Sequence, residues 1–246
     1  MSSLPSGMSD ATLNYLITFT VAHEGDTPFM YNNWPLKNPN KDVTVGVGRA
    51  IDDENMAASA EIRSMFTVKA TGLPASPQEM KTEFRRVYDL ARTADNLHSD
   101  FEAKSPLKMD RGAMLRSLAD KLLNWWDQKG QSIPDFAAIP AQAQVALMSY
   151  NYGARLRTAP KMCAAVNSKD FTAAAKESLV PGWDPQKNAA HNKLFMNAAM
   201  IVAFGRDVAT LPPVIGPFKP PPDLDLSFLY FPMIPLIVRQ AMLTRL

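Results

Sequence analysis

Apolar side chains recur every three or four positions along most of the chain as far as residue 204, which is the spacing of one helix face. The first such stretch begins after Ser9, places Leu13, Ile17 and Thr20 on one side, and ends at Gly25. Serine before a helix and glycine after it are typical caps. The same reasoning predicts further helices at about 53–65, 77–91, 110–130, 140–150, 161–166, 171–179 and 188–204.

One segment departs from the helical period. Residues 42–48 alternate apolar and small or polar side chains, Val43-Thr44-Val45-Gly46-Val47-Gly48, which predicts a short strand. The polar stretch before it, residues 26–41, is expected to be a loop. The chain is therefore predicted to be α+β and predominantly α, with one domain over residues 1–207.

The composition changes in residues 208–246. Prolines crowd this tail, remove backbone donors and fix φ, so the tail is expected to be extended rather than helical. Its apolar run, residues 228–238, is interrupted by two prolines and is too short to span a membrane. We expect the tail to pack across an apolar groove of the domain; contact with a membrane surface and docking of a partner are the alternatives.

Composition and charge exclude several classes of protein. The net charge of the 246 residues is only +2, which disfavours a nucleic-acid binder. Cys163 is the single cysteine, so neither an internal disulfide nor a multi-cysteine zinc site can form. The three histidines lie far apart in the sequence and show no metal-binding spacing. We expect no metal, no cofactor, no transmembrane span and no secretory signal.

Glu24 is the most informative single residue. It continues the apolar side of the first helix at its C-terminal end, where a carboxylate is unusual. A carboxyl group in a partly apolar pocket keeps its proton more readily, and it can then donate that proton to a leaving-group oxygen. Glycoside hydrolysis is the reaction class that uses such an acid, opposite a second polar or acidic group.

The motifs around Glu24 resemble those of the phage-type lysozymes and the wider lysozyme-like muramidases. That family carries a helix ending in Glu-Gly, a Tyr seven positions after the Glu, a glycine-containing hairpin, and an Asn-x-Gly on a late helix. The matching segments here, over about residues 13–204, are Glu24-Gly25, Tyr31, Thr44-Val45-Gly46-Val47-Gly48 and Asn151-Tyr152-Gly153. The resemblance implies a two-lobed lysozyme-like fold with a small β-hairpin lobe and a helical lobe.

The chain also departs from the family pattern. Where the family has its second carboxylate, this chain has Asn33, which cannot act as a base or nucleophile. Asp42 lies two positions before Thr44, so both side chains face the same side of the expected strand. We therefore expect Glu24 as general acid, Asp42 as the second carboxylate and Thr44 as the group that positions a water.

Other polar and aromatic residues of these motifs are candidates for substrate binding. They are Tyr31, Asn33, Trp34, Arg49, Asn151 and Tyr152. The aromatic rings can pack on sugar rings or belong to the core, and the Asn151 amide can bind the acid, bind an N-acetyl group or bridge helices. Arg49 stands where the family has His, and it can pair with Glu24 or with another acid.

The resemblance implies a bacteriolytic enzyme that cleaves the bond between N-acetylmuramic acid and N-acetylglucosamine in peptidoglycan. A lytic transglycosylase and a non-catalytic glycan-binding protein are the alternatives. Without a signal peptide, we expect a phage endolysin or an antibacterial effector. Such a protein is made in the cytoplasm and acts in the periplasm, as a monomer, with an immunity or carrier protein as a partner.

Overall fold

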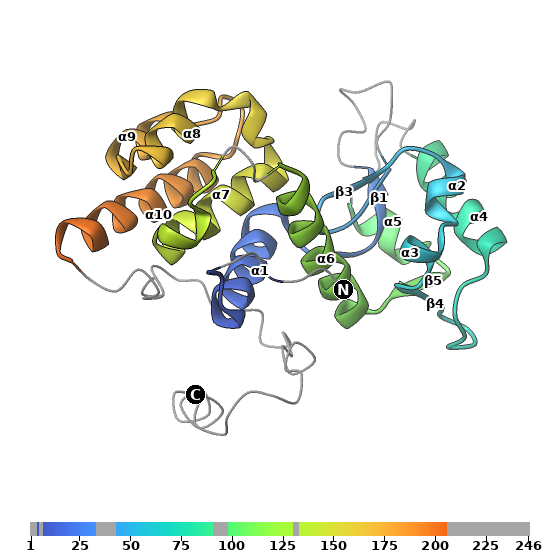
Figure 1. The fold of residues 1–246 in the computed structure, drawn as a ribbon. Coiled ribbons are helices and arrows are strands. Elements are labelled where there is room, and N and C mark those ends of the chain that lie inside the picture. Colours follow the sequence, from blue (N-terminus) through green and yellow to red (C-terminus); the bar gives the residue numbers. More distant parts are fainter. Residues whose placement is uncertain (1–3, 5–6, 33–42, 91–97, 130–132, 206–246) are drawn as a thin grey trace, which may run out of the picture.

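The computed structural model describes residue 4 and residues 7–32, 43–90, 98–129 and 133–205. In these ranges the chain is mainly helical and has two small antiparallel sheets, so the predicted α+β class with predominant helix is confirmed. The elements form two lobes, one built from helices alone and one that contains every described strand (Figure 1). None of the helices in the described part of the chain is both long and apolar enough to cross a membrane.

The helical lobe is built around one buried helix, α7, Ala141–Gly153. All of its residues from 141 to 151 are buried, which suits a helix with small and apolar side chains on every face. Helices α1, α6 and α10 pack against it. The bounds of the other elements of this lobe are α1 Asp10–Glu24, α6 Arg111–Lys129, η2 Phe136–Ala138, η3 Leu156–Thr158, α8 Pro160–Asn167, α9 Phe171–Glu177 and α10 Pro185–Ala203.

The smaller lobe contains a three-stranded sheet in the order β1-β2-β3, with antiparallel neighbours. Tyr31 of β1 lies opposite Thr44 of β2, and Val45 of β2 lies opposite Arg49 of β3. A second sheet pairs β4 with β5. The elements are β1 Thr27–Asn32, β2 Val43–Gly46, β3 Arg49–Ile51, α2 Glu54–Ala57, α3 Ala60–Arg63, β4 Phe66–Val68, α4 Pro77–Leu90, α5 His98–Ala103 and β5 Leu107–Met109.

Several local features agree with the sequence pattern. The predicted strand is present as β2, and α4 begins with a capping box in which the Glu79 N–H bonds the Ser76 hydroxyl at 3.3 Å. The Glu79 carboxylate accepts from the Ser76 N–H at 2.7 Å in return.

Two predictions of secondary structure are wrong. Residues 27–32 of the expected loop form strand β1, and the helix expected at 53–65 is divided into α2 and α3.

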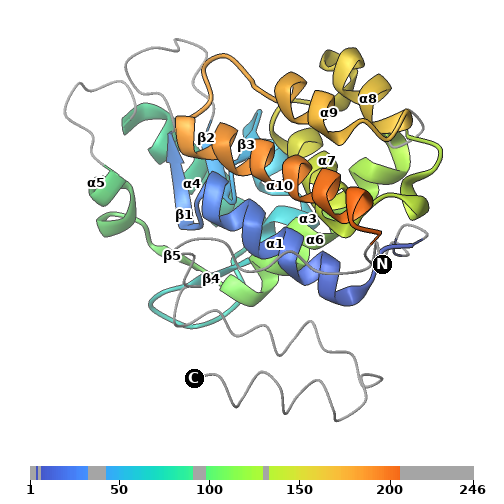
Figure 2. The same cartoon turned by 90° about the vertical axis from the view of Figure 1, so that its left-hand side faces the viewer.

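The two lobes meet where α1 passes into β1. At this point Asp26 forms an ion pair with Arg111, the first residue of α6. Helices α1 and α10 lie side by side, and the rings of Phe19 and His191 are 5.3 Å apart (Figure 2). The end of α1 is therefore held by contacts with α6 and α10, which define the position of Glu24.

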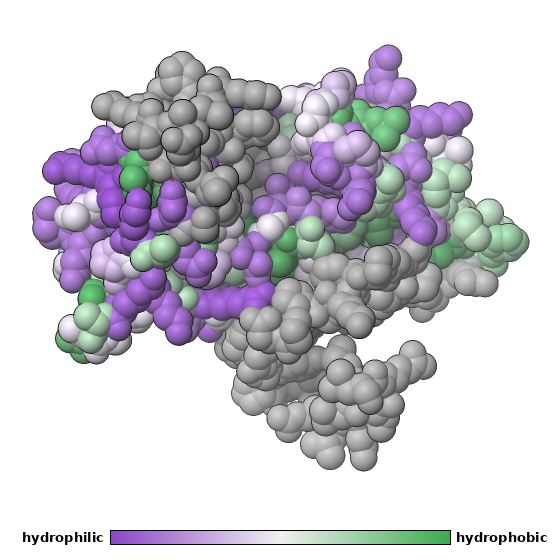
Figure 3. All heavy atoms as spheres, turned by 180° about the vertical axis from the view of Figure 1, so that it is seen from behind, coloured by the Kyte–Doolittle hydropathy of each residue, from purple (hydrophilic) through white to green (hydrophobic). Residues whose placement is uncertain are grey.

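The described surface seen from behind is largely hydrophilic (Figure 3). Apolar side chains are nevertheless exposed towards the C-terminal end of α10, and these are Met196, Met200, Val202 and Phe204. The tail, residues 208–246, follows this helix in the sequence and lies outside the described residues.

Candidate active site at the junction of the lobes

Glu24 is the last residue of α1, and its side chain is 19% exposed. The chain leaves the helix through Gly25, whose φ of 82° lies in a region that other residues rarely adopt. The N–H of Gly25 still bonds the Val21 carbonyl at 2.9 Å, which closes the last helical turn. The carboxylate of Glu24 is therefore held at the lobe junction rather than in bulk water.

One oxygen of this carboxylate is bound by a buried lysine. Lys187 of α10 donates from Nζ to Oε1 of Glu24 at 2.5 Å, and the lysine side chain is 8% exposed. The same ammonium lies 3.8 Å from the centre of the Trp183 ring, a cation–π contact that also holds it in place. A charge-assisted hydrogen bond of this kind is among the stronger polar contacts in proteins, so it fixes the position of the carboxylate.

The end of α7 approaches this ion pair closely. A Cβ atom on Gly153 would lie 2.9 Å from Nζ of Lys187 and 3.2 Å from Oε1 of Glu24. It would also lie 2.8 Å from the edge of the Trp183 ring. A side chain at position 153 would displace the pair, so glycine is needed here for the close approach.

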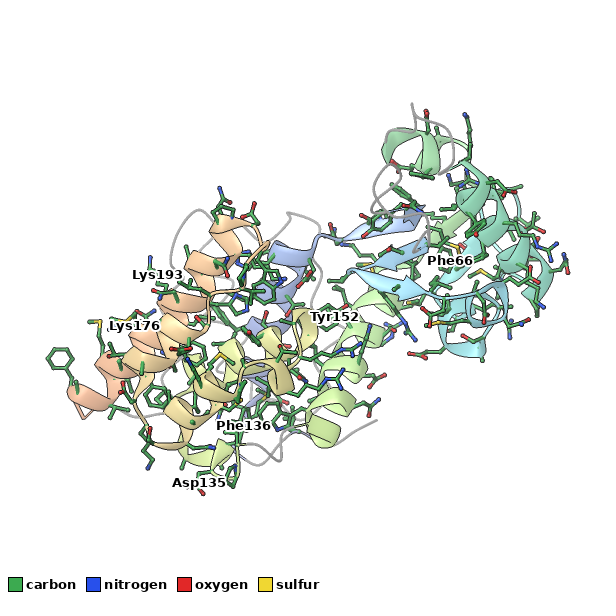
Figure 4. The ribbon with its side chains drawn as sticks, turned by 90° about the horizontal axis from the view of Figure 1, so that it is seen from above. Phe66, Asp135, Phe136, Tyr152, Lys176 and Lys193 are labelled. Carbon is green, nitrogen blue, oxygen red and sulfur yellow. The ribbon has the colours of Figure 1, made fainter. Side chains whose placement is uncertain are left out.

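The turn of the β-hairpin faces the second carboxylate oxygen. A Cβ atom on Gly48 would lie 3.8 Å from Oε2 of Glu24, so the turn is an immediate neighbour of the carboxylate. Tyr152 of α7 lies between the helical lobe and the strand-containing lobe (Figure 4), and its hydroxyl donates to the Val47 carbonyl of this turn. Burial raises the pKa of Tyr152, so the phenol stays protonated and remains a donor.

Tyr31 and Thr44 are both buried and lie opposite each other in the β1–β2 ladder. Burial raises the pKa of Tyr31; a hydrogen bond from Thr27 lowers it, and the negative charge of Glu24 raises it further. Tyr31 is therefore close enough to Glu24 for the charge of the carboxylate to affect the phenol. Its ring meets that of Phe29 edge-on, with 6.4 Å between the ring centres, which is a core contact.

Arg49 and Asn151 have partners within the protein. Arg49 donates to Oε1 of Glu61 at 2.5 Å and to the Ser117 hydroxyl at 3.2 Å, so it pairs with an acid other than Glu24. The Asn151 amide oxygen accepts from the Leu156 N–H at 3.1 Å, and this bond ties the end of α7 to η3. These contacts favour the helix-bridging interpretation of Asn151.

Three predicted site residues lie outside the described residues: Asn33, Trp34 and Asp42. Of the other candidates, Glu24, Tyr31, Arg49 and Tyr152 lie close enough for their charges to influence one another, whereas the Asn151 amide is bound at η3. Sequence reasoning missed Lys187, Trp183 and the role of Gly153. Lys187 is 163 positions from Glu24, and no local pattern marks it. Gly153 did belong to a segment that the sequence singled out, the Asn-x-Gly.

Two histidines lie behind the ion pair in an aromatic cluster with Phe19, Tyr150 and Trp183. His191 is fully buried and its Nδ1 donates to the Lys187 carbonyl at 2.9 Å. Burial lowers the pKa of His191 to about 4, and burial followed by the Lys187 charge lowers the pKa of His23. The cluster is therefore neutral near pH 7 and adds no positive charge to that of Lys187.

A small cavity of about 20 Å³ lies beside the same turn and is lined by residues of β2, β3, α6 and α7. Arg49, Ser117, Lys121 and Tyr152 supply its polar groups, and Glu24 is not among the lining residues. The volume is enough for a water-sized group and not for a sugar ring.

Comparisons of the chain with protein-family models, with curated proteins and with solved structures found no match.

Proposed function

We propose that this chain is a muramidase with a lysozyme-like fold, which hydrolyses the β-1,4 bond between N-acetylmuramic acid and N-acetylglucosamine. The observation that supports this most is the placement of Glu24. Its partly buried carboxylate lies at the lobe junction, with Oε1 bound by Lys187 and Oε2 facing the glycine turn at Gly48. A single acid held at the junction between two lobes suits protonation of a glycosidic oxygen.

In the proposed reaction, protonated Glu24 donates its proton to the glycosidic oxygen as the bond from that oxygen to the anomeric carbon breaks. A water adds to the anomeric carbon and gives its proton to the second carboxylate. The sequence assigns that role to Asp42 and the positioning of the water to Thr44. If a muramyl hydroxyl attacks the anomeric carbon instead of water, it gives its proton to the Glu24 carboxylate, which has just lost its own. No second carboxylate is then needed, and the product is an anhydro-sugar, as in lytic transglycosylases.

Lys187 and the hairpin turn lie against different oxygens of the Glu24 carboxylate. Lys187 binds Oε1, and the turn at Gly48 lies beside Oε2. Lys187 is therefore a positioning residue that holds Oε1 and leaves the Oε2 edge for the substrate.

Lysis of outer-membrane-stripped cells, followed by turbidity, tests the proposal. Glu24→Gln keeps the shape of the side chain but cannot donate an acidic proton, so we expect activity to fall about 100-fold or more. Glu177→Gln, on the exposed end of α9, is the matched control and should retain full activity. A Glu24→Gln protein that lyses cells like the control contradicts the proposal.

Product analysis then separates the two chemistries. Reducing ends indicate hydrolysis, and anhydro-sugars indicate a transglycosylase. Asp42→Asn is expected to lower the hydrolytic rate, and undiminished activity would remove Asp42 from the mechanism.

The rival proposal is a non-catalytic glycan-binding protein. Asn33, at the position of the family's second acid, favours it, because an amide cannot act as a base or nucleophile. Wild-type protein that binds peptidoglycan but releases neither reducing ends nor anhydro-sugars would support this rival.

As a bacteriolytic enzyme or effector, the protein would act in the periplasm, with peptidoglycan as its substrate and an immunity or carrier protein as a partner. Production with an added secretion signal tests this. We expect lysis when the protein is exported and none when it stays in the cytoplasm, and Glu24→Gln should abolish the difference.

A further inference from the structure

A cationic segment follows α7 where this helix ends at the lobe junction. Residues 136–169 contain no aspartate or glutamate, and their four cations are Arg155, Arg157, Lys161 and Lys169. All four residues are exposed, and within the ranges that the structure describes their side chains form no hydrogen bond or ion pair. An exposed positive segment without an acid of its own suits an anionic ligand.

Arg155 is the cation of this segment that follows the candidate site most closely. Gly153, the last residue of α7, is exposed, and a Cβ atom there would lie 3.2 Å from Oε1 of Glu24. Arg155 comes two residues later, so its Cα lies at most about 7.6 Å from that of Gly153. Lys187 already binds Oε1 of Glu24. The Arg155 guanidinium is therefore available to a substrate that lies across this end of α7.

The backbone at Arg155 is one that glycine would adopt more easily. Its φ is 66° and its ψ is 122°, outside the regions that residues with a side chain ordinarily occupy. The Asn151 amide oxygen accepts from the Leu156 N–H at 3.1 Å, and the Thr158 hydroxyl donates to the Arg155 carbonyl at 2.8 Å, so neighbours hold this turn. Residues held in such conformations are concentrated at binding and active sites.

Lys169 provides a comparison within the same chain. It is the only other non-glycine residue with a positive φ in the described ranges, at 59°, and it follows α8 as Arg155 follows α7. Its N–H bonds the Val166 carbonyl and the Asp170 N–H bonds the Ala165 carbonyl, both at 2.9 Å, which is a regular helix ending. Helix α8, about 12 Å long, separates it from Arg155 along the chain. Lys169 shares the charge and exposure of Arg155 but does not adjoin the Glu24 site in the sequence.

We infer that Arg155, with Arg157 beside it in the sequence, binds a carboxylate that the glycan strand carries next to the cleaved bond. This inference rests on the proposed function, because it places the strand across the end of α7 beside Glu24. A guanidinium group binds a carboxylate through two parallel hydrogen bonds. The carboxylate belongs to the lactyl group in peptide-free strands and to the stem peptide where the lactyl group is amidated. In both cases Arg155 favours muramyl strands over chitin-type strands, which carry no carboxylate.

Binding of disaccharides to the full chain tests this subsite without turnover. The probes are N-acetylglucosaminyl-N-acetylmuramic acid with a free lactyl carboxylate, the same disaccharide with a dipeptide and only peptide carboxylates, and chitobiose with none. None of them contains the bond that the proposed reaction cleaves. Affinities are measured by nuclear magnetic resonance titration at pH 7. We expect one of the acids to bind about tenfold more tightly than chitobiose, and the stronger acid identifies the source.

Arg155→Gly is expected to reduce the affinity for that acid to the value for chitobiose and to leave the affinity for chitobiose unchanged. Its unfolding temperature should not fall, because glycine adopts this conformation without strain. A loss of binding without a loss of stability separates a role in substrate binding from a structural role. Arg155→Lys keeps the charge but not the paired hydrogen bonds, so it should retain part of the preference.

Lys169→Gly is the matched control, because it removes an exposed cation from the corresponding backbone position after α8. It should leave the preference at the wild-type value. The preference of the wild-type protein should also weaken as the ionic strength rises from about 0.05 M to about 0.5 M, since the site is exposed. The inference is overturned by a preference that survives Arg155→Gly, by an equal loss in Lys169→Gly, by a preference independent of salt, or by no preference for either acid in the wild-type protein.

The subsite and the catalytic proposal can fail separately. If Arg155-dependent binding of an acid is present but the wild-type protein cleaves no glycan, the subsite stands and belongs to the rival glycan-binding protein. If Glu24-dependent cleavage is present but Arg155→Gly changes no affinity, the muramidase proposal stands and the subsite fails.

Discussion

At the scale of single residues, the candidate site depends on how one carboxylate is held. Sequence reasoning identified Glu24 because an acidic residue continues an apolar helix side and precedes a glycine hairpin. Both signals are local, so they can be read along the chain. The partner of Glu24 could not be predicted, because Lys187 comes from a helix 163 positions later and is brought close only by tertiary packing. Asp42, which the same reasoning proposed, stays a prediction.

Lys187→Met tests what this partner does. Methionine keeps the length of the side chain but removes the ammonium that binds Oε1 of Glu24 and lies over the Trp183 ring. If this contact positions the acid for catalysis, its loss lets the carboxylate leave the productive geometry. We expect kcat to fall by about tenfold while the unfolding temperature changes little.

Lys193→Met is the matched control, because Lys193 is exposed on the same helix (Figure 4). Its kcat should equal that of the wild-type protein. An unchanged kcat in Lys187→Met would show that the ammonium does not position Glu24.

At the scale of elements, the long helices were predicted well and the short elements were not. Helices α1, α4, α6 and α7 have caps or several turns of periodic apolar residues, which single-sequence reasoning detects. Strand β1 was missed because its sequence, Thr-Pro-Phe-Met-Tyr-Asn, does not alternate and is stabilised by pairing with β2. The Ser59 hydroxyl caps α3, so the predicted helix at 53–65 is interrupted there.

The contact between α7 and the hairpin turn can be tested at this scale. Tyr152→Phe removes the hydroxyl that donates to the Val47 carbonyl and keeps the ring beside Lys121. We expect the free energy of unfolding to fall by about 1 kcal/mol, the usual net value of one hydrogen bond. We also expect lytic activity to fall, because the turn beside Glu24 is then held less firmly.

Chemical denaturation measures the free energy of unfolding, and the turbidity assay measures the lytic activity. Tyr15→Phe, on a half-buried face of α1, is the control and should change neither quantity. If both variants behave alike, the hydroxyl of Tyr152 does not fix the turn.

At the scale of the whole molecule, stability depends on pH through a histidine buried in the helical lobe, behind Glu24 and Lys187. The helical lobe buries His191 between α1, α7 and α10 in an aromatic cluster. In the neutral ring Nδ1 carries the hydrogen that bonds the Lys187 carbonyl, and Nε2 has no hydrogen-bond partner among the described residues. Burial is the main reason that the ring stays neutral, and protonation would also place a second positive charge beside Lys187.

The direction of the pH effect follows from the different pKa of His191 in the folded and in the unfolded protein. The pKa of His191 is about 4 in the folded protein, whereas an unfolded histidine has a pKa of about 6.5. Between these values the unfolded chain binds more protons, so stability rises with pH across this window. Stability is therefore lost as the pH falls from about 6.5 towards 4, by up to about 3 kcal/mol. The pKa of His23 is also lowered, so this ring contributes in the same direction.

Comparison of His191→Phe with the wild-type protein separates the two histidines, because phenylalanine keeps the ring contacts but cannot be protonated. Free energies of unfolding are measured by denaturant titration at several pH values between 4 and 8. We expect the difference between wild type and variant to be constant above pH 7 and to shift in favour of the variant as the pH falls below 6.5. Parallel curves over the whole range would mean that His191 is not held neutral by burial. The aromatic cluster would then not keep a second positive charge, that of His191, away from Lys187.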